Sequence, residues 1–124
     1  MNMNFIKCSN VKSGKINEKK VLDYLNRNND PVDYWINNNV KNEYDVIDFK
    51  HNERNLKIEL KSRNYKSNHF VDWQIGMNKI MEMINDKENR YYVFFLFYDG
   101  LYKWDFNMKN LINQTTCKEG GTER

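Results

Sequence analysis

The chain has few of the residues that build disulfide frameworks or zinc sites. Its 124 residues include two cysteines, Cys8 and Cys117, which are far apart and have no CxxC partner or neighbouring histidine. Disulfide frameworks and zinc sites need several such residues at short, regular spacings. We therefore expect two free thiols without a role, in a protein of a reducing compartment.

Histidines and phosphate-binding glycines are equally scarce. His51 and His69 are the only histidines, and neither can be combined with a serine or cysteine into a nucleophilic system. No glycine-rich loop of the Walker or Rossmann kind occurs. We interpret His51 as a surface residue of a turn. His69, in a loop after a strand, is interpreted either as a surface residue or as a contact to a phosphate.

Long hydrophobic segments are missing too. The longest apolar run is YYVFFLFY at 91–98, whereas a membrane-spanning helix needs about 20 such residues. The first ten residues, MNMNFIKCSN, contain no apolar signal core. We expect an intracellular protein without a membrane partner. Its many asparagines and lysines suit an AT-rich phage or large-virus genome.

What the chain does contain fits one domain with an aromatic-rich core. Hydrophobic residues make up 40% and aromatic residues 15% of it, and the net charge is only +3. The basic residues are concentrated, however, since six lie between 50 and 66 against two glutamates. Such a stretch either binds a phosphate backbone or forms a solvated charged hairpin, and composition leaves both open.

The apolar periodicity predicts an α/β fold with a mixed sheet flanked by helices, in the order αβββαββ. A helix should begin near residue 13 and end before Pro31, and a second, with Asn68 as N-cap, should cover 71–85. Asp99-Gly100 predicts a hairpin turn. Strands are expected at 32–40, 44–49, 56–63, 91–98 and 101–106. The domain core is therefore about 13–106, and the tail 107–124 should be frayed.

One predicted strand, LKIELKSR at 56–63, raises the question of function. Successive side chains of a strand point to opposite faces, so its leucines and isoleucine share one face. The other face carries Lys57, Glu59, Lys61 and Arg63. This is either an amphipathic strand with a wet side, or a carboxylate and an ammonium held together as metal-assisted phosphodiester cleavage requires.

A second carboxylate should come from the preceding strand. Asp45 and Asp48 are separated by an odd number of positions, so they lie on opposite faces. A register that pairs 45 with 59 places Asp45 beside Glu59 and Lys61, and leaves Asp48 on the apolar face. Asp45, Glu59 and the Leu60 carbonyl then offer the oxygen ligands that Mg²⁺ or Mn²⁺ prefers. Lys61 would orient or deprotonate the attacking water, or stabilise charge on the phosphate.

The segments YDVIDF and LKIELKSR resemble the motif of the PD-(D/E)xK nucleases, and with the upstream helix they are similar to Holliday-junction resolvases of the archaeal type. The resemblance implies a restriction-endonuclease-like core. Its functional residues would be Asp45 and Glu59 as metal ligands, Lys61 as the catalytic lysine, Glu18 as a helix-borne metal ligand and Gln74 near the lysine. Tyr44 replaces the family's usual proline, and the loop after Arg63 departs from the resolvase pattern.

Together these features predict a Mg²⁺-dependent endodeoxyribonuclease. We expect a homodimer that acts on branched or otherwise structured DNA in recombination, repair or replication. Lys57, Arg63, Lys66 and His69 are the expected DNA contacts. Restriction-, mismatch- or mobile-element-type nucleases and a non-cleaving nucleic-acid-binding module remain the alternatives. For Glu18 the alternative is a first-turn carboxylate that complements the helix dipole.

Overall fold

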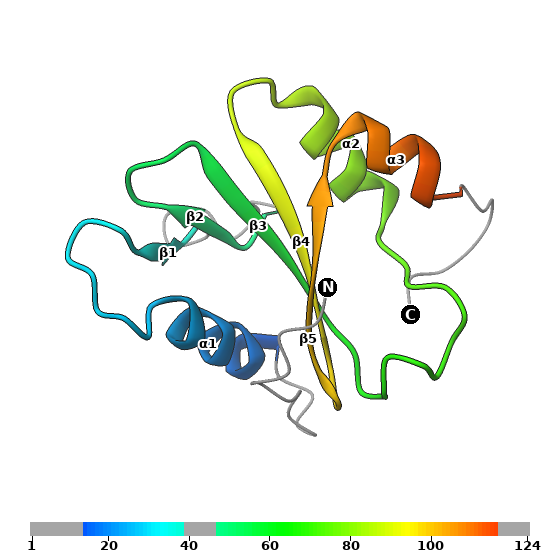
Figure 1. Ribbon diagram of the computed structural model, residues 1–124, viewed down its shortest axis with the longest axis horizontal. Coiled ribbons are helices and arrows are strands. Elements are labelled where there is room, and N and C mark those ends of the chain that lie inside the picture. The colour runs from blue at the N-terminus through cyan, green and yellow to red at the C-terminus, as the bar shows by residue number, and fades with distance from the viewer. Residues whose placement is uncertain (1–13, 39–46, 117–124) are drawn as a thin grey trace.

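The computed structural model describes residues 14–38 and 47–116 (Figure 1). Cys8, Cys117, Tyr44 and Asp45 lie outside these ranges. The elements are α1 (Gly14–Leu25), β1 (Trp35–Asn37), β2 (Phe49–His51), β3 (Leu56–Ser62), α2 (Met77–Asn85), β4 (Arg90–Phe97), β5 (Gly100–Phe106) and α3 (Met108–Gln114). This confirms an α/β fold, and the predicted order of elements is followed by one additional helix.

In the part of the chain that the structure describes, the sheet is mixed and contains five strands in the order β1-β2-β3-β4-β5. Only β3 and β4 run parallel, and the other neighbouring strands are antiparallel. A parallel pair needs a crossover connection, which α2 and the loop before it supply. Apolar residues of α1 pack on one face of the sheet, while those of α2 and α3 pack on the other (Figure 1). The molecule therefore has two small cores, one on each side of the sheet.

The strand β4 lies inside the sheet and is apolar on both faces, as predicted. Phe94 and Leu96 face α1, whereas Val93 and Phe95 face α2. The predicted hairpin is also confirmed, because β4 continues into β5 with Phe97 paired to Gly100. Gly100 has φ 153°, a conformation that only glycine adopts easily.

The second helix is shorter than predicted, because α2 begins at Met77 rather than at residue 71. Gly76, the residue before it, has extended φ and ψ of −65° and 145°. Upstream, the Trp73 indole donates to the Ser67 carbonyl at 2.9 Å. These contacts hold 68–76 as an irregular loop, so Asn68 is not a helix cap and Gln74 does not lie on a helix.

The C-terminal segment is more ordered than predicted. The helix α3 is capped by Asn107, whose side chain accepts a hydrogen bond of 2.8 Å from the Asn110 backbone N–H. Its Leu111 packs against the core on the α2 face. The fraying expected for 107–124 is therefore wrong for the first part of that range, and 117–124 lie outside the described residues.

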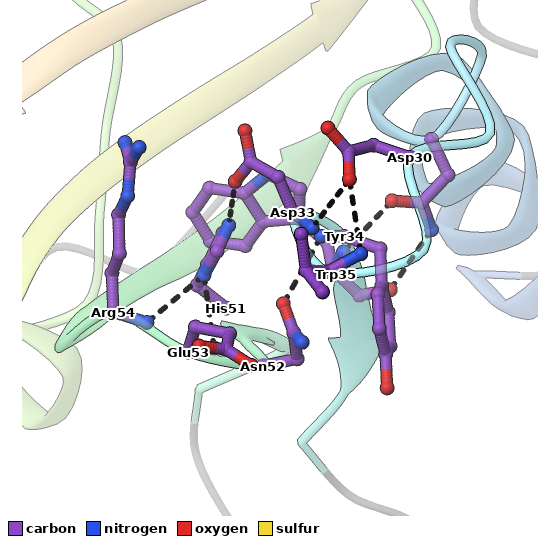
Figure 2. A network of polar contacts seen from close by, with 10 residues as sticks. Asp30, Asp33, Tyr34, Trp35, His51, Asn52, Glu53 and Arg54 are labelled. Atoms are coloured by element: carbon purple, nitrogen blue, oxygen red, sulfur yellow. Dashed lines mark hydrogen bonds and ion pairs between the residues drawn. The ribbon is translucent and has the colours of Figure 1, made fainter.

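His51 is not the surface residue that the sequence suggested, since it is only 6% exposed. Its Nδ1 accepts hydrogen bonds from the backbone N–H groups of Glu53 and Arg54, at 3.1 and 3.0 Å. Its Nε2 is paired with Asp33, and the ring packs edge-on against Trp35 (Figure 2). His51 belongs to β2 and ties the β2–β3 turn to the segment before β1, which is a structural role.

Candidate active site

The charged face of β3 is buried rather than wet. Glu59 is 1% exposed and Lys61 9% exposed, so four consecutive residues of β3, 58–61, are buried. Taking a carboxylate and an ammonium out of water is costly unless each finds partners. The simple interpretation of an amphipathic strand is therefore wrong for this part of β3.

The register of β2 and β3 brings Asp48 to Glu59. Phe49 pairs with Ile58 and Lys50 with Lys57, so the next position along places 48 opposite 59. Asp48 also accepts a hydrogen bond from the Leu60 backbone N–H, at 2.8 Å from its Oδ2. The predicted register, 45 with 59, is wrong by three positions. An odd shift reverses the faces, which explains why Asp48 shares the side of Glu59.

Glu59 lies between two ammonium groups. Lys61 Nζ is 3.6 Å from Glu59 Oε2, and Lys79 Nζ is 3.5 Å from Glu59 Oε1. Lys79 comes from α2, and its side chain is 19% exposed. Lys79 is not among the site residues predicted from the sequence. Lys79 stands beside Ile80 and one turn before Met83, which are the buried residues of α2. This spacing indicates a lysine at the edge of the core.

Glu18 of α1 completes the cluster. The pKa of Glu18 is raised to about 7, first by burial and then by the charge and hydrogen bonding of Asp48, while Lys15 and Lys79 oppose the rise. An N-terminal carboxylate that only complemented the helix dipole would show the opposite shift. Helix α1, the residue before β2, strand β3 and helix α2 therefore each supply charged groups to one site.

Glu59 shows the same effect more strongly. Burial raises its pKa to about 8, the charge of Asp48 adds to the rise, and Lys79 and Lys61 act against it. The charge of Asp48 thus disfavours ionisation of both Glu18 and Glu59. The cluster needs protons, ammonium groups or a metal cation to be stable.

The donor chemistry of the cluster fits Mg²⁺ or Mn²⁺, which prefer oxygen ligands. The Oε1 atom of Glu59 is a buried acceptor that has no hydrogen-bond donor among the described residues. Across 14–38 and 47–116, however, no three acidic, histidine or cysteine side chains already surround a metal position. Lys79 Nζ, at 3.5 Å, would compete with a metal ion for Glu59 Oε1. The main chain of Leu60 also contacts the cluster, because its N–H donates to Asp48 Oδ2.

The other predicted residues lie around β3 and the loop after it. The Arg63 guanidinium donates to the carbonyls of Ser62 and Gln74, at 3.1 and 3.3 Å, and so anchors the loop. Lys66 and His69 are exposed on that loop, with the His69 ring 5.0 Å from that of Tyr65. Lys57 is half-buried on β3. Lys57, Lys66 and His69 thus each keep part of their surface accessible to solvent.

Comparison with known proteins yields no relative: no family model, curated protein or solved structure matches the chain. None of the described helices combines the length and the apolar character that crossing a membrane would demand.

The raised pKa of Glu59 gives a prediction about stability in EDTA. Its pKa rises from an ordinary 4.5 to about 8 on folding, so the folded state favours the protonated form. The stability that this provides is complete below pH 4.5 and is lost as the pH rises through 8. In the Glu59→Gln variant the side chain at position 59 cannot ionise, so this loss of stability with rising pH does not occur. The melting temperature of the variant should exceed that of the wild type by about 5 °C or more at pH 8.5 and by much less at pH 5.

Thermal unfolding at several pH values, followed by circular dichroism, checks this. Glu53→Gln is the matched control, because Glu53 is exposed on the β2–β3 turn, and it should show no such trend. A difference between Glu59→Gln and wild type that stays constant from pH 5 to 8.5 would contradict the prediction.

Proposed function

We propose that the chain is a metal-dependent nuclease of the PD-(D/E)xK kind, which hydrolyses phosphodiester bonds of DNA. The observation that carries the proposal is the meeting of Asp48, Glu59, Lys61 and Glu18 in one cluster, in which Glu59 and Lys61 are buried and Asp48 and Glu18 are half-buried. The motif is retained when it starts at Asp48, since an aspartate is followed on the next strand by Glu-Leu-Lys. Ile47 then stands where the family has proline.

In this proposal Asp48, Glu59 and Glu18 hold the metal ion through their carboxylate oxygens. A bound Mg²⁺ supplies a Lewis acid for the phosphate and a more acidic water. Lys61 lies 3.6 Å from Glu59 on the same strand, where it orients the attacking water or neutralises charge that develops on the phosphate. Burial keeps bulk water away and makes each of these charges more effective. A site of three acids and two lysines also favours a catalytic site over a surface that only binds DNA. Without a metal ion, the carboxylates would repel a phosphate backbone.

The substrate is proposed to be branched, nicked or otherwise structured DNA, as in recombination, repair or replication. The described domain is small and by itself offers little surface with which to recognise a long sequence. A homodimer would place two such sites on a junction, whose two cleavage positions are related by two-fold symmetry.

The test is a cleavage assay with end-labelled linear, nicked, flap and four-way DNA in Mg²⁺, Mn²⁺ or EDTA. We expect cleavage with either metal, none in EDTA, and faster cleavage of the branched substrates. Glu59→Gln protein, purified identically, controls for contaminating nucleases. Full cleavage in EDTA would contradict the metal mechanism, and tight DNA binding without cleavage in any metal would favour a non-cleaving module.

A further inference from the structure

A groove of about 820 Å³ lies between the loop before α2, α2 itself, the sheet and α3. In Figure 1 this is the region where α2 and α3 lie close to each other beside β5. Its walls include aromatic rings and side-chain amides, namely Trp73, Gln74, Phe95, Trp104, Asn113 and Gln114. The volume falls in the range of pockets that bind small organic groups.

Trp73 is held firmly and yet is 40% exposed. Its indole N–H donates to the Ser67 carbonyl at 2.9 Å. Its ring lies 5.2, 4.9 and 5.1 Å from the rings of Phe95, Phe97 and Tyr102. Stacking on a ring that is already fixed costs little conformational entropy. Trp73 therefore offers a preorganised aromatic surface for stacking. Its ring is fixed by the core and yet remains partly exposed.

The opposite wall combines a second indole with amides. The Trp104 N–H donates to Gln114 Oε1 at 2.8 Å, which holds this amide of α3 at the groove. Asn113 is an exposed neighbour on the same helix. Among the described residues of the lining, Asp72 alone carries a charge. Flat apolar walls with amides at the edge suit a planar, uncharged heteroaromatic ring that carries hydrogen-bonding groups, which describes a nucleobase.

The groove is lined by elements that neighbour those of the candidate active site. Phe95, in its lining, pairs with Lys61 across the parallel strands β3 and β4, which are about 4.8 Å apart. Ile80, also in the lining, directly follows Lys79. The lining of the groove thus includes a strand partner of Lys61 and a sequence neighbour of Lys79, so the groove and the site share β4 and α2.

We propose that this groove binds an unpaired nucleobase of the strand whose phosphate occupies the site. The inference rests on the proposed nuclease function and narrows its substrate to DNA with an unpaired nucleotide beside the cleaved bond. A base inside a duplex is stacked on both sides and must leave the helix to reach Trp73, whereas a base at a branch or bulge has already lost a neighbour.

Binding in EDTA tests the groove without relying on cleavage. The probe is a duplex with one unpaired 2-aminopurine, compared with the same duplex carrying an abasic residue there and with a fully paired duplex. Wild-type protein should bind the base-containing probe about tenfold more tightly than the abasic one and quench its fluorescence. Trp73→Leu should lose that preference and the quenching, while its affinity for the paired duplex stays unchanged.

Two further variants make the result decisive. Asn113→Trp fills the groove from an exposed position of α3 and should remove the preference without affecting folding. Met81→Ala, on α2 but outside the lining, is the control and should keep it. Equal affinity of wild-type protein for abasic and base-containing probes would overturn the inference. Loss of self-association in Trp73→Leu with base preference intact would also overturn it and assign the groove to a second copy. Base preference in a protein that never cleaves DNA would support the groove and reject the nuclease.

Discussion

Asp48→Asn should lower the rate of Mg²⁺-dependent cleavage at least about a hundredfold, at saturating DNA and metal. Asp48 lies opposite Glu59 and interacts with both Glu18 and Glu59. An asparagine supplies one neutral oxygen in place of a charged carboxylate. That oxygen can still accept the hydrogen bond from the Leu60 N–H, so the strand pairing should remain.

Asp45→Asn is the matched comparison, because it makes the same chemical change three positions earlier. A register of 45 with 59 predicts that Asp45 holds the metal, whereas the observed pairing of β2 and β3 gives this place to Asp48. We expect Asp45→Asn to keep most of the activity. An inactive Asp45→Asn together with an active Asp48→Asn would reject the site proposed here.

A stability measurement separates lost chemistry from lost folding in Asp48→Asn. The charge of Asp48 raises the pKa of both Glu18 and Glu59, so its removal relieves repulsion among the ionised carboxylates. In EDTA at pH 8 the melting temperature of Asp48→Asn should equal or exceed that of the wild type. A marked decrease would mean that Asp48 acts mainly through its hydrogen bond to β3.

The candidate site shows which features a sequence can predict. Alternation along β3 correctly placed Glu59 and Lys61 on one face, because the two-residue period of a strand is a local property. Alternation in the preceding strand established only that Asp45 and Asp48 lie on opposite faces. Choosing between them required the strand register, which is determined by packing of Phe49 and Ile58 in the core.

The second helix illustrates the same limit. An apolar stripe from Phe70 to Ile84 predicted one continuous helix with Gln74 at its edge. The aromatic residues of the first half pack as a loop instead, so periodicity was present without a helix. The real helix α2 begins at Met77 and presents Lys79 to Glu59. This contact joins residues 20 positions apart, and no local pattern predicts it.

The two lysines should have different and separable roles. Lys61→Met should lower the cleavage rate at least about a hundredfold with little change in DNA affinity, because Lys61 is proposed to act on the reacting groups. Single-turnover kinetics at saturating DNA and binding in EDTA distinguish the two quantities. If Lys61→Met cleaved normally at saturation and only bound more weakly, Lys61 would be a backbone contact.

Lys79→Met should instead change how metal use depends on pH. Lys79 lowers the pKa of both Glu18 and Glu59, so its loss raises both values further. It also frees Glu59 Oε1, which Lys79 Nζ approaches to 3.5 Å. Below about pH 7 the protonated carboxyls should bind metal less readily, and the variant should need several-fold more Mg²⁺ than wild type. Above about pH 9 both carboxyls are ionised and the competing ammonium is gone, so the variant should need less.

The measurement is the Mg²⁺ concentration for half-maximal cleavage from pH 6 to 9.5, in wild type and variant, and the two curves should cross. Lys19→Met is the control, because Lys19 is exposed on α1, pairs with Asp23 at 3.1 Å, and is not among the charges that shift the pKa of Glu18 or Glu59. Its curve should follow the wild type throughout. Parallel curves for Lys79→Met, shifted equally at every pH, would show that Lys79 neither competes for Glu59 nor tunes the two glutamates. In that case the ammonium would act only as a general positive charge near the DNA.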